Sequence, residues 1–169
     1  MSNNSPSADD APVMDAGPLD PDRALLWYQS WVDAWNSHDP ERVRPLVTDD
    51  FRLETPTTRN SGWEITGPGS AADYMRYVLT AYPDLTWERT GPPLLAPDSA
   101  RAAFSWRGAG HFSGTLTPPG IPGTGLPFEF TGLEVFDFRG GRACHLYASY
   151  DLMGLLRQTG VHRSRSERP

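Results

Sequence analysis

The chain has 169 residues and a mass of 18.7 kDa, with 38% apolar and 21% charged residues. This is the size of one domain, and the apolar content is enough to build a core, which excludes wholesale disorder. The net charge of −6 and the pI of about 5.1 exclude the basic footprint that nucleic-acid binding needs. One cysteine and four scattered histidines favour neither a disulfide nor a zinc site, so we expect no bound metal.

Composition divides the chain into a disordered N-terminal tail over residues 1–20, a folded domain over residues 21–161 and a polar tail over residues 162–169. The first tail contains four aspartates, no basic residue and no apolar stretch, which is unlike a signal peptide. No apolar run approaches the ~20 residues that span a bilayer. We therefore expect a cytoplasmic protein that binds neither a membrane nor nucleic acid.

The first helix is expected to begin at Pro21, because Asp20 is a favourable N-cap and proline fits the first turn of a helix. Its apolar residues recur every three or four positions, which is typical of a helix with one buried face. They are Ala24, Trp27, Tyr28, Trp31, Ala34 and Trp35. Three shorter helices, each preceded by a capping Asp or Ser, are expected over residues 40–47, 71–82 and 152–158.

Strands are expected over residues 51–55, 85–90, 100–110, 127–138 and 142–150. Residues 57–69 and the Pro/Gly-rich stretch 117–125 are expected to be loops, and Arg139-Gly140-Gly141 a tight turn. Helices that gather against an antiparallel sheet give an α+β domain. The order of elements predicts a curved antiparallel sheet with helices on its concave side, which together enclose a cone with one mouth.

The strand over residues 127–138 contains the main candidate for chemistry. Its even positions hold four phenylalanines, one glycine and Glu134, and period-two alternation places all of them on one face. A carboxylate among aromatic rings is costly to ionise, so we expect its pKa to rise toward neutrality, as in a general acid/base. Two alternatives stay open: an ion pair of Glu134 with Arg107, or a β-bulge at Gly132 that turns the side chain to solvent.

Two other polar residues are candidates for catalysis. His111 stands between glycines at a strand end and has the chemistry of an acid/base or of a donor to a substrate carbonyl, but strict alternation places it with Arg101 and Arg107 on the wetter face. Asp151 would be a carboxylate at the mouth of the cone, but its place before the last helix is also that of an N-cap.

Most of the aromatic residues are expected to pack in the core. Those that face the cone would suit a flat, apolar, ring-bearing ligand. The expected substrate-binding residues are Tyr28, Trp31, Trp35, Tyr77, Phe136 and Tyr150. The chain has no G-x-G-x-x-G, P-loop or G-x-S-x-G motif, and all fifteen basic residues are Arg, so we expect no nucleotide cofactor, no lysine Schiff base and no other cofactor.

Several short motifs occur along the folded part, namely Trp35-Asn-Ser-His-Asp39, Tyr82-Pro-Asp84-Leu, Gly110-His-Phe-Ser-Gly114, Pro122-Gly-Thr-Gly125 and Phe138-Arg-Gly-Gly-Arg142. The most specific one follows Tyr150 and has the form D-x-x-x-L-x-R-Q-x-G, ending at Gly160. In these motifs the chain resembles the SnoaL-like polyketide cyclases, which belong to the superfamily of nuclear transport factor 2 and ketosteroid isomerase. The resemblance implies a cone-shaped α+β barrel that forms a homodimer or higher oligomer and needs no cofactor or metal.

The resemblance also implies where acids and bases would lie, and this chain departs from that pattern. The acid/base Asp of the cyclases matches Ala148, and its partner His matches Glu134. The base of ketosteroid isomerase matches Thr55. Both familiar bases are therefore replaced, while an acid stands at the position that the phenylalanine pattern marks.

Our leading hypothesis is a cofactor-free acid/base enzyme of secondary metabolism that cyclises or isomerises an apolar, carbonyl-bearing, polyketide-like substrate. Glu134 would move the proton, with His111 or Tyr150 holding the carbonyl oxygen and Asp151 orienting the site. The alternatives are an epoxide-opening hydrolase or dehydratase on the same fold, and a non-catalytic small-molecule binding module, which Ala148 favours.

Overall fold

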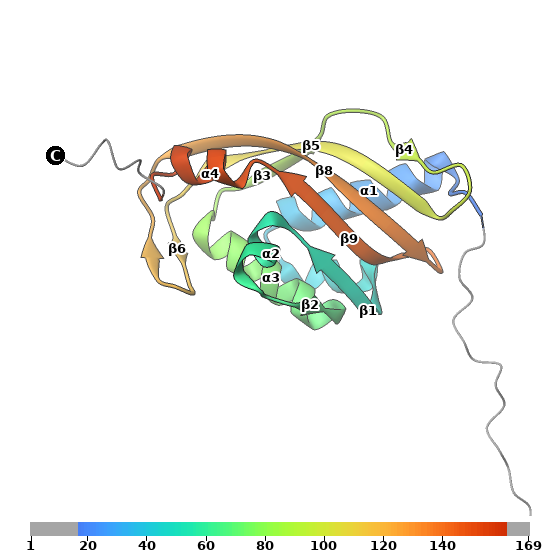
Figure 1. Ribbon diagram of the computed structural model, residues 1–169, viewed down its shortest axis with the longest axis horizontal. Helices are drawn as coiled ribbons and strands as arrows, with labels where there is room; N and C mark the ends of the chain where they lie inside the picture. Colours follow the sequence, from blue (N-terminus) through green and yellow to red (C-terminus); the bar gives the residue numbers. More distant parts are fainter. Residues whose placement is uncertain (1–16, 162–169) are drawn as a thin grey trace, which may run out of the picture.

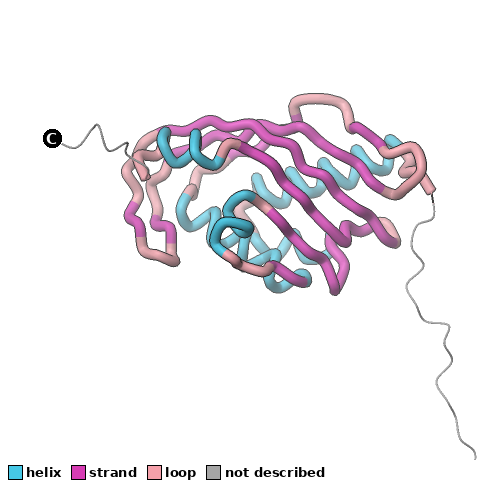
Figure 2. Tube along the Cα trace, in the orientation of Figure 1, coloured by secondary structure: helices cyan, strands magenta, loops and turns pink. Residues whose placement is uncertain are grey.

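The computed structural model describes residues 17–161 (Figure 1). The tails expected over residues 1–20 and 162–169 lie outside the described residues, apart from residues 17–20. One curved sheet runs in the order β2-β1-β9-β8-β5-β3, with β4 paired to β5, and it arches over helices α1 and α3 (Figures 1 and 2). The fold is thus the expected α+β class, with helices on the concave side of a sheet that does not close.

Three of the helices begin close to where the sequence predicts. Helix α1 (Pro21–Asn36) starts after Asp20, whose side chain accepts a hydrogen bond from the Arg23 amide. The segment over Pro40–Leu46 is a 3-10 helix, and helix α4 (Leu152–Gln158) follows Asp151. Helix α3 (Gly67–Ala81) begins earlier than predicted, since Thr66 rather than Ser70 precedes its first turn.

The expected loop over residues 57–69 is wrong, because this stretch contains helix α2 (Pro56–Ser61) and strand β2 (Ile65–Thr66). Thr55 and Thr58 form a reciprocal capping box, and Pro56 occupies the first turn. A proline after a strand ends it, and here Pro56 also begins a helix. The expected loop over residues 117–125 likewise contains part of a small hairpin of β6 (Thr115–Leu116) and β7 (Ile121–Pro122).

Apart from β2, the sheet consists of six strands, most of them paired antiparallel. They are β1 (Val47–Glu54), β3 (Thr86–Arg89), β4 (Leu94–Leu95), β5 (Arg101–His111), β8 (Pro127–Arg139) and β9 (Arg142–Tyr150). One pair departs from the expected antiparallel sheet: β1 lies parallel to β9, with Leu53 opposite Leu146. Residue alternation predicts which face a side chain takes but contains no information about the direction of a distant partner strand.

The alternation predicted for β8 is confirmed. Phe128, Glu134, Phe136 and Phe138 are buried under the arch, whereas Glu129, Thr131 and Leu133 are exposed on the convex face. Helix α1 packs Trp27 and Trp31 against Phe136, so the core lies between this helix and the centre of the sheet. Over residues 17–161, none of the helices combines the length and the apolarity that crossing a membrane would take.

Candidate functional site

Glu134 lies in the middle of β8, with Phe104 of β5 and Ala148 of β9 directly opposite. Its side chain is 4% exposed, which is rare for a carboxyl group. The ladder between β5 and β8 runs without interruption past Gly132, so no bulge turns the carboxyl outward. The inward position follows from strand parity, as the sequence predicts.

The partner of Glu134 is a tyrosine and not an arginine. The Tyr28 hydroxyl of α1 donates to Glu134 Oε2 at 2.8 Å, and the Tyr28 ring stacks on Phe104 with centroids 4.0 Å apart. Arg107 instead pairs with Glu88 at 2.7 Å and faces Glu129 at 3.8 Å, where it is partly exposed. The ion-pair alternative is therefore excluded, and the carboxyl meets a neutral donor.

Burial raises the pKa of Glu134 to about 7, while the Tyr28 hydrogen bond and the neighbouring Trp31 indole act in the opposite direction. Near neutral pH the carboxyl therefore exists in both protonation states, as a group that takes and returns protons must. Burial, followed by the adjacent Glu134, raises the pKa of Tyr28 well above its ordinary value. Tyr28 consequently keeps its proton and remains a donor to Glu134.

Glu134 is the one carboxyl group in the wall of an interior cavity of about 60 Å³. The rest of the wall is apolar or aromatic and comes from α1, α3, α4 and the sheet. It consists of Trp35, Leu53, Tyr74, Val78, Tyr82, Leu85, Trp87, Phe128, Phe130, Leu146, Tyr150 and Leu155. Its lining, apolar with one convergent carboxyl, is that of a small-molecule site, but its volume is below the roughly 300–1,000 Å³ of such sites, so a substrate must displace part of the wall.

Several buried indole donors lie near this carboxyl or elsewhere in the core without partners. Among the described residues, the N–H groups of Trp31, Trp35, Trp87 and Trp106 are buried and make no hydrogen bond, and Trp35 and Trp87 line the cavity. Trp31 lies near enough to lower the Glu134 pKa but does not reach hydrogen-bonding geometry. Because buried donors are usually paired, the interior favours a ligand that brings hydrogen-bond acceptors.

Some of the predicted substrate-binding residues lie near Glu134 or in the cavity wall, and others do not. Trp35 and Tyr150 line the cavity, and Tyr150 hydrogen-bonds to Thr57 Oγ1 at 2.9 Å. Tyr28 and Trp31 contact or approach the carboxyl from α1. Phe136 is fully buried in the core, and Tyr77 packs on Trp63 and Tyr74 outside the cavity wall.

His111 lies outside the cavity wall, so the role of a donor to the substrate carbonyl does not fit its position. Its side chain is 53% exposed, and Nδ1 lies 2.6 Å from Asp84 Oδ2. The other Asp84 oxygen accepts from the His111 amide at 2.8 Å, so Asp84 holds this end of β5. The physical reason is strand parity, which places odd positions of β5 on the convex face.

Asp151 also lies outside the cavity wall and is exposed. Its Oδ1 accepts a hydrogen bond from the Gly154 amide at 2.8 Å, which is the contact of a helix N-cap. The expected orienting role is therefore not supported by the geometry.

Sequence reasoning missed several residues of the wall, namely Tyr74, Tyr82, Trp87, Phe128 and Phe130. The helical spacing of Tyr74 and the alternation of Phe128 and Phe130 indicate burial, which the structure confirms. Neither pattern tells a core residue from a cavity residue, because that depends on the curvature of the sheet.

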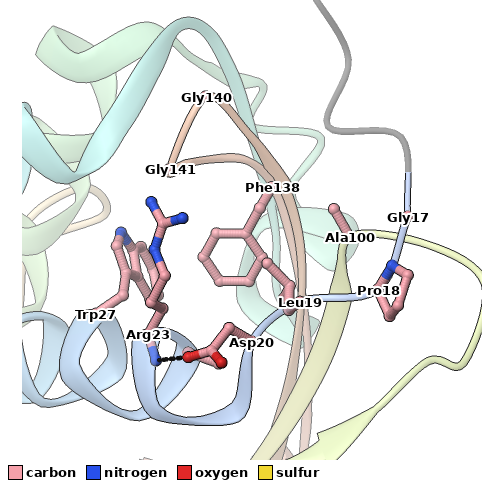
Figure 3. A pocket seen from close by; sticks show the side chains of 11 residues that line it. Gly17, Pro18, Leu19, Asp20, Arg23, Trp27, Ala100, Phe138, Gly140 and Gly141 are labelled. Carbon is pink, nitrogen blue, oxygen red and sulfur yellow. Dashed lines mark hydrogen bonds between the residues drawn. The ribbon is translucent and has the colours of Figure 1, made fainter.

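A larger cavity of about 420 Å³ lies at the N-terminal end of α1, beside the turn between β8 and β9 (Figure 3). Figure 3 shows the Arg23 side chain over Trp27 and beside Phe138, with Asp20 engaged by the Arg23 amide. The Asp20 carboxyl acts as a helix cap, and no buried polar group lines this space. It therefore lacks the chemistry present around Glu134.

Within residues 17–161, no three His, Cys, Asp or Glu side chains gather closely enough to hold a metal ion. The chemistry of the cavity around Glu134 is consequently that of one carboxyl, aromatic rings and neutral N–H and O–H donors.

Solved structures share this fold. TsrD from Streptomyces laurentii is 20% identical, with a TM-score of 0.70 over 85% of this chain and 99% of its own. A candidate SnoaL-like polyketide cyclase from Jannaschia sp. CCS1 is 14% identical, with a TM-score of 0.70 over 93% and 100%. IdmH, a candidate polyketide cyclase from Streptomyces antibioticus, is 24% identical, with a TM-score of 0.64 over 80% and 97%.

No curated protein matches the chain significantly. The profile of the SnoaL-like domain matches residues 28–146, which run from the tyrosine that binds Glu134 to the middle of β9. This range covers most of the chain and includes all of β5 and β8, with the first half of β9. The chain therefore belongs to the family of SnoaL-like domain proteins.

Proposed function

We propose that the protein is a cofactor-free acid/base enzyme that cyclises or isomerises an apolar, carbonyl-bearing small molecule in the cavity around Glu134. The observation that supports this most is the buried carboxyl itself, with a pKa raised to about 7 in an aromatic wall. Fold neighbours described as candidate polyketide cyclases support a polyketide-like substrate, and with it a role in secondary metabolism such as antibiotic biosynthesis. We place this activity in the cytoplasm.

In the proposed reaction, the Glu134 carboxylate removes a proton from the carbon next to a substrate carbonyl and leaves an enolate. The enolate carbon then attacks a second carbonyl, which closes a ring, or it is reprotonated at another position, which moves a double bond. In either case Glu134 returns the proton, so no external acid, base or cofactor is consumed. Tyr28 holds Oε2 throughout, which leaves Oε1 as the working oxygen.

The position of Glu134 supports a transfer of the family's acid from one strand to the next. The resemblance places the cyclase acid/base at Ala148 and its partner at Glu134, and these two residues are directly opposite each other across β8 and β9. A carboxyl at either position would reach the same side of the arch. Thr55, which matches the ketosteroid isomerase base, instead caps α2 and contacts the Tyr74 hydroxyl at 3.1 Å.

The test does not require the natural substrate. Proton–deuterium exchange at the α-carbons of cyclohexanone, followed by NMR in heavy water, measures the proposed proton transfer directly. Replacing Glu134→Gln should reduce the protein-catalysed exchange about 100-fold or more, the usual contribution of a general base. The matched control is Tyr147→Phe on the convex face, which should exchange like the native protein. Native exchange that survives in Glu134→Gln would refute the assignment.

A second candidate is ligand binding without catalysis, which the alanine at the family acid/base position favours. Cyclohexanone that perturbs the indole resonances of the native protein but undergoes no catalysed exchange would support it. A hydrolase that opens an epoxide differs again, because its product gains the mass of one water, whereas a dehydratase product loses one. Mass spectrometry of the converted substrate separates these reactions.

We further propose a homodimer formed through the convex face of the sheet. Leu133 and Tyr147 are exposed there at 37% and 42%, beside the half-buried Val135. Charged groups flank this patch, with Arg101 bound to Asp137 at one end. Light scattering should give twice the chain mass for the native protein and one chain mass for Leu133→Glu, and a native monomer would contradict the proposal.

A further inference from the structure

The cavity wall contains a second polar feature, which is a group of tyrosine hydroxyls at some distance from Glu134. Tyr74 and Tyr82 come from α3 and its C-terminal end, and Tyr150 ends β9. All three line the cavity, and Tyr77 packs beside them against Tyr74. Burial together with the neighbouring hydroxyls of Tyr77 and Tyr150 raises the pKa of Tyr82 well above its ordinary value, so its hydroxyl stays protonated.

Two of these lining hydroxyls are already engaged. Tyr74 pairs with Thr55 Oγ1 at 3.1 Å, and Tyr150 pairs with Thr57 Oγ1 at 2.9 Å. The Tyr82 hydroxyl, in contrast, makes no hydrogen bond to any residue between 17 and 161, although the side chain is 7% exposed. The Tyr82 oxygen is not one of the buried, unpartnered polar atoms of residues 17–161, so it reaches solvent in the free protein and is available to a ligand.

Tyr82 reaches the cavity at a different end from the base. Its ring packs on Phe128 of β8 with centroids 4.9 Å apart, and Phe128 lies six residues before Glu134 on that strand. Phe128 and Glu134 both line the cavity, so a ligand that occupies its length contacts both ends.

We propose that Tyr82 donates a hydrogen bond to a second oxygen of the substrate, while Glu134 works beside the first carbonyl. This rests on the proposed function and narrows its substrate class to compounds with two acceptor oxygens on one apolar skeleton. Tyr74 and Tyr150, fixed by their threonines, line the same part of the wall. A protonated amine offers no acceptor to Tyr82 and is disfavoured.

The test compares two rigid probes of similar size, cyclohexanone and 1,4-cyclohexanedione, neither of which can donate a hydrogen bond. Affinities are measured by NMR titration of the indole N–H resonances. The native protein should bind the dione about three- to ten-fold more tightly than the ketone, which is the contribution of one net hydrogen bond. Tyr82→Phe should lose this preference, and Tyr147→Phe on the convex face should keep it. Thermal unfolding of Tyr82→Phe shows whether the ring still packs against Phe112 and Phe128.

Equal affinities of the native protein for the two probes would overturn the proposal, as would a preference unchanged in folded Tyr82→Phe. Glu134→Gln separates the two proposals. If the dione preference depends on Tyr82 while Glu134→Gln still exchanges α-protons, the second oxygen site stands and the proposed catalysis fails. If exchange requires Glu134 but the probes bind equally, the catalysis stands and this inference fails.

Discussion

The contact between Tyr28 and Glu134 decides how the buried carboxyl behaves. A hydrogen bond to a carboxylate stabilises the ionised form, while burial stabilises the neutral form, and here burial is the larger effect. Because α1 holds Tyr28 in place through its stack on Phe104, the carboxyl has one fixed oxygen and one that faces its surroundings. The orientation of the base thus comes from a neutral residue on another element.

Removing the Tyr28 hydroxyl tests the balance between burial and hydrogen bonding at Glu134. Tyr28→Phe keeps the ring stack but removes the donor, so the pKa of Glu134 should rise further, by about one unit. The pH dependence of cyclohexanone exchange reports this, because its rising limb should move to higher pH in the variant. A limb at the native position would show that Tyr28 contributes packing alone. Tyr147→Phe provides the control with an intact site.

At this scale the sequence predicts Glu134 well and the other two polar candidates poorly. Alternation along β8 is enough to place a single acid among phenylalanines under the arch. The same alternation along β5 places His111 outside, and Asp151 has the local signature of a cap, which the structure confirms as its contact with Gly154. Tyr28 as the partner of Glu134 was not predictable, because 106 residues separate them and only the packing of α1 brings them together.

At the scale of the elements, strand β8 needs a glycine at position 132, where the Trp106 ring packs against the backbone. Gly132 lies opposite Trp106, and a Cβ at this position would come within 2.3 Å of the Trp106 ring and 2.6 Å of the Ser149 carbonyl oxygen. The indole therefore occupies the space of the missing side chain, which allows β5, β8 and β9 to stay in register. This close approach is the physical reason for glycine in an otherwise β-rich stretch.

Gly132→Ala should lower the free energy of unfolding by about 1 to 3 kcal/mol, because either the ring or the backbone must move. Denaturant unfolding measures the change. Gly69→Ala is the matched control, since its nearest neighbour is the flexible end of Arg44 at 3.7 Å, and in the first turn of α3 it should raise stability by up to about 1 kcal/mol. Equal effects of the two substitutions would contradict the packing argument.

Helix α4 offers a second test among the elements. Asp151→Ala removes the acceptor of the Gly154 amide and should cost about 1 kcal/mol of stability, whereas Asp151→Asn should restore most of it. Chemical denaturation of the two variants measures both values. If Asn is as destabilising as Ala, the charge rather than the cap contact stabilises this helix.

Over the whole molecule, the raised pKa of Glu134 makes stability depend on pH. The folded chain holds this proton with a pKa of about 7, against an ordinary 4.5, so folding favours the protonated form. This proton contributes roughly 3 kcal/mol to the free energy of unfolding. The contribution is fully present below pH 4.5 and is lost as the pH rises to about 7.

Denaturant unfolding near pH 5 and near pH 8 checks this, because the native protein should be more stable at the lower pH. Glu134→Gln, which is neutral at both, should lose most of the difference. Three carboxyls have a pKa lowered from 3.8 and stay ionised between pH 5 and pH 8, so they do not contribute to the difference. They are Asp50, Asp84 and Asp137. A native protein that is equally stable at both pH values would contradict the burial argument.

The parallel ladder between β1 and β9 has a consequence for how the chain reaches its final form. It joins residues more than 90 positions apart, and β9 must first be delivered by its hairpin with β8. During synthesis, β1 leaves the ribosome long before β9. The edge of β1 that pairs with β9 therefore stays unpaired until β9 is made. We therefore expect completion of the arch, and with it the shielding of Glu134 from water, to be among the last events of folding.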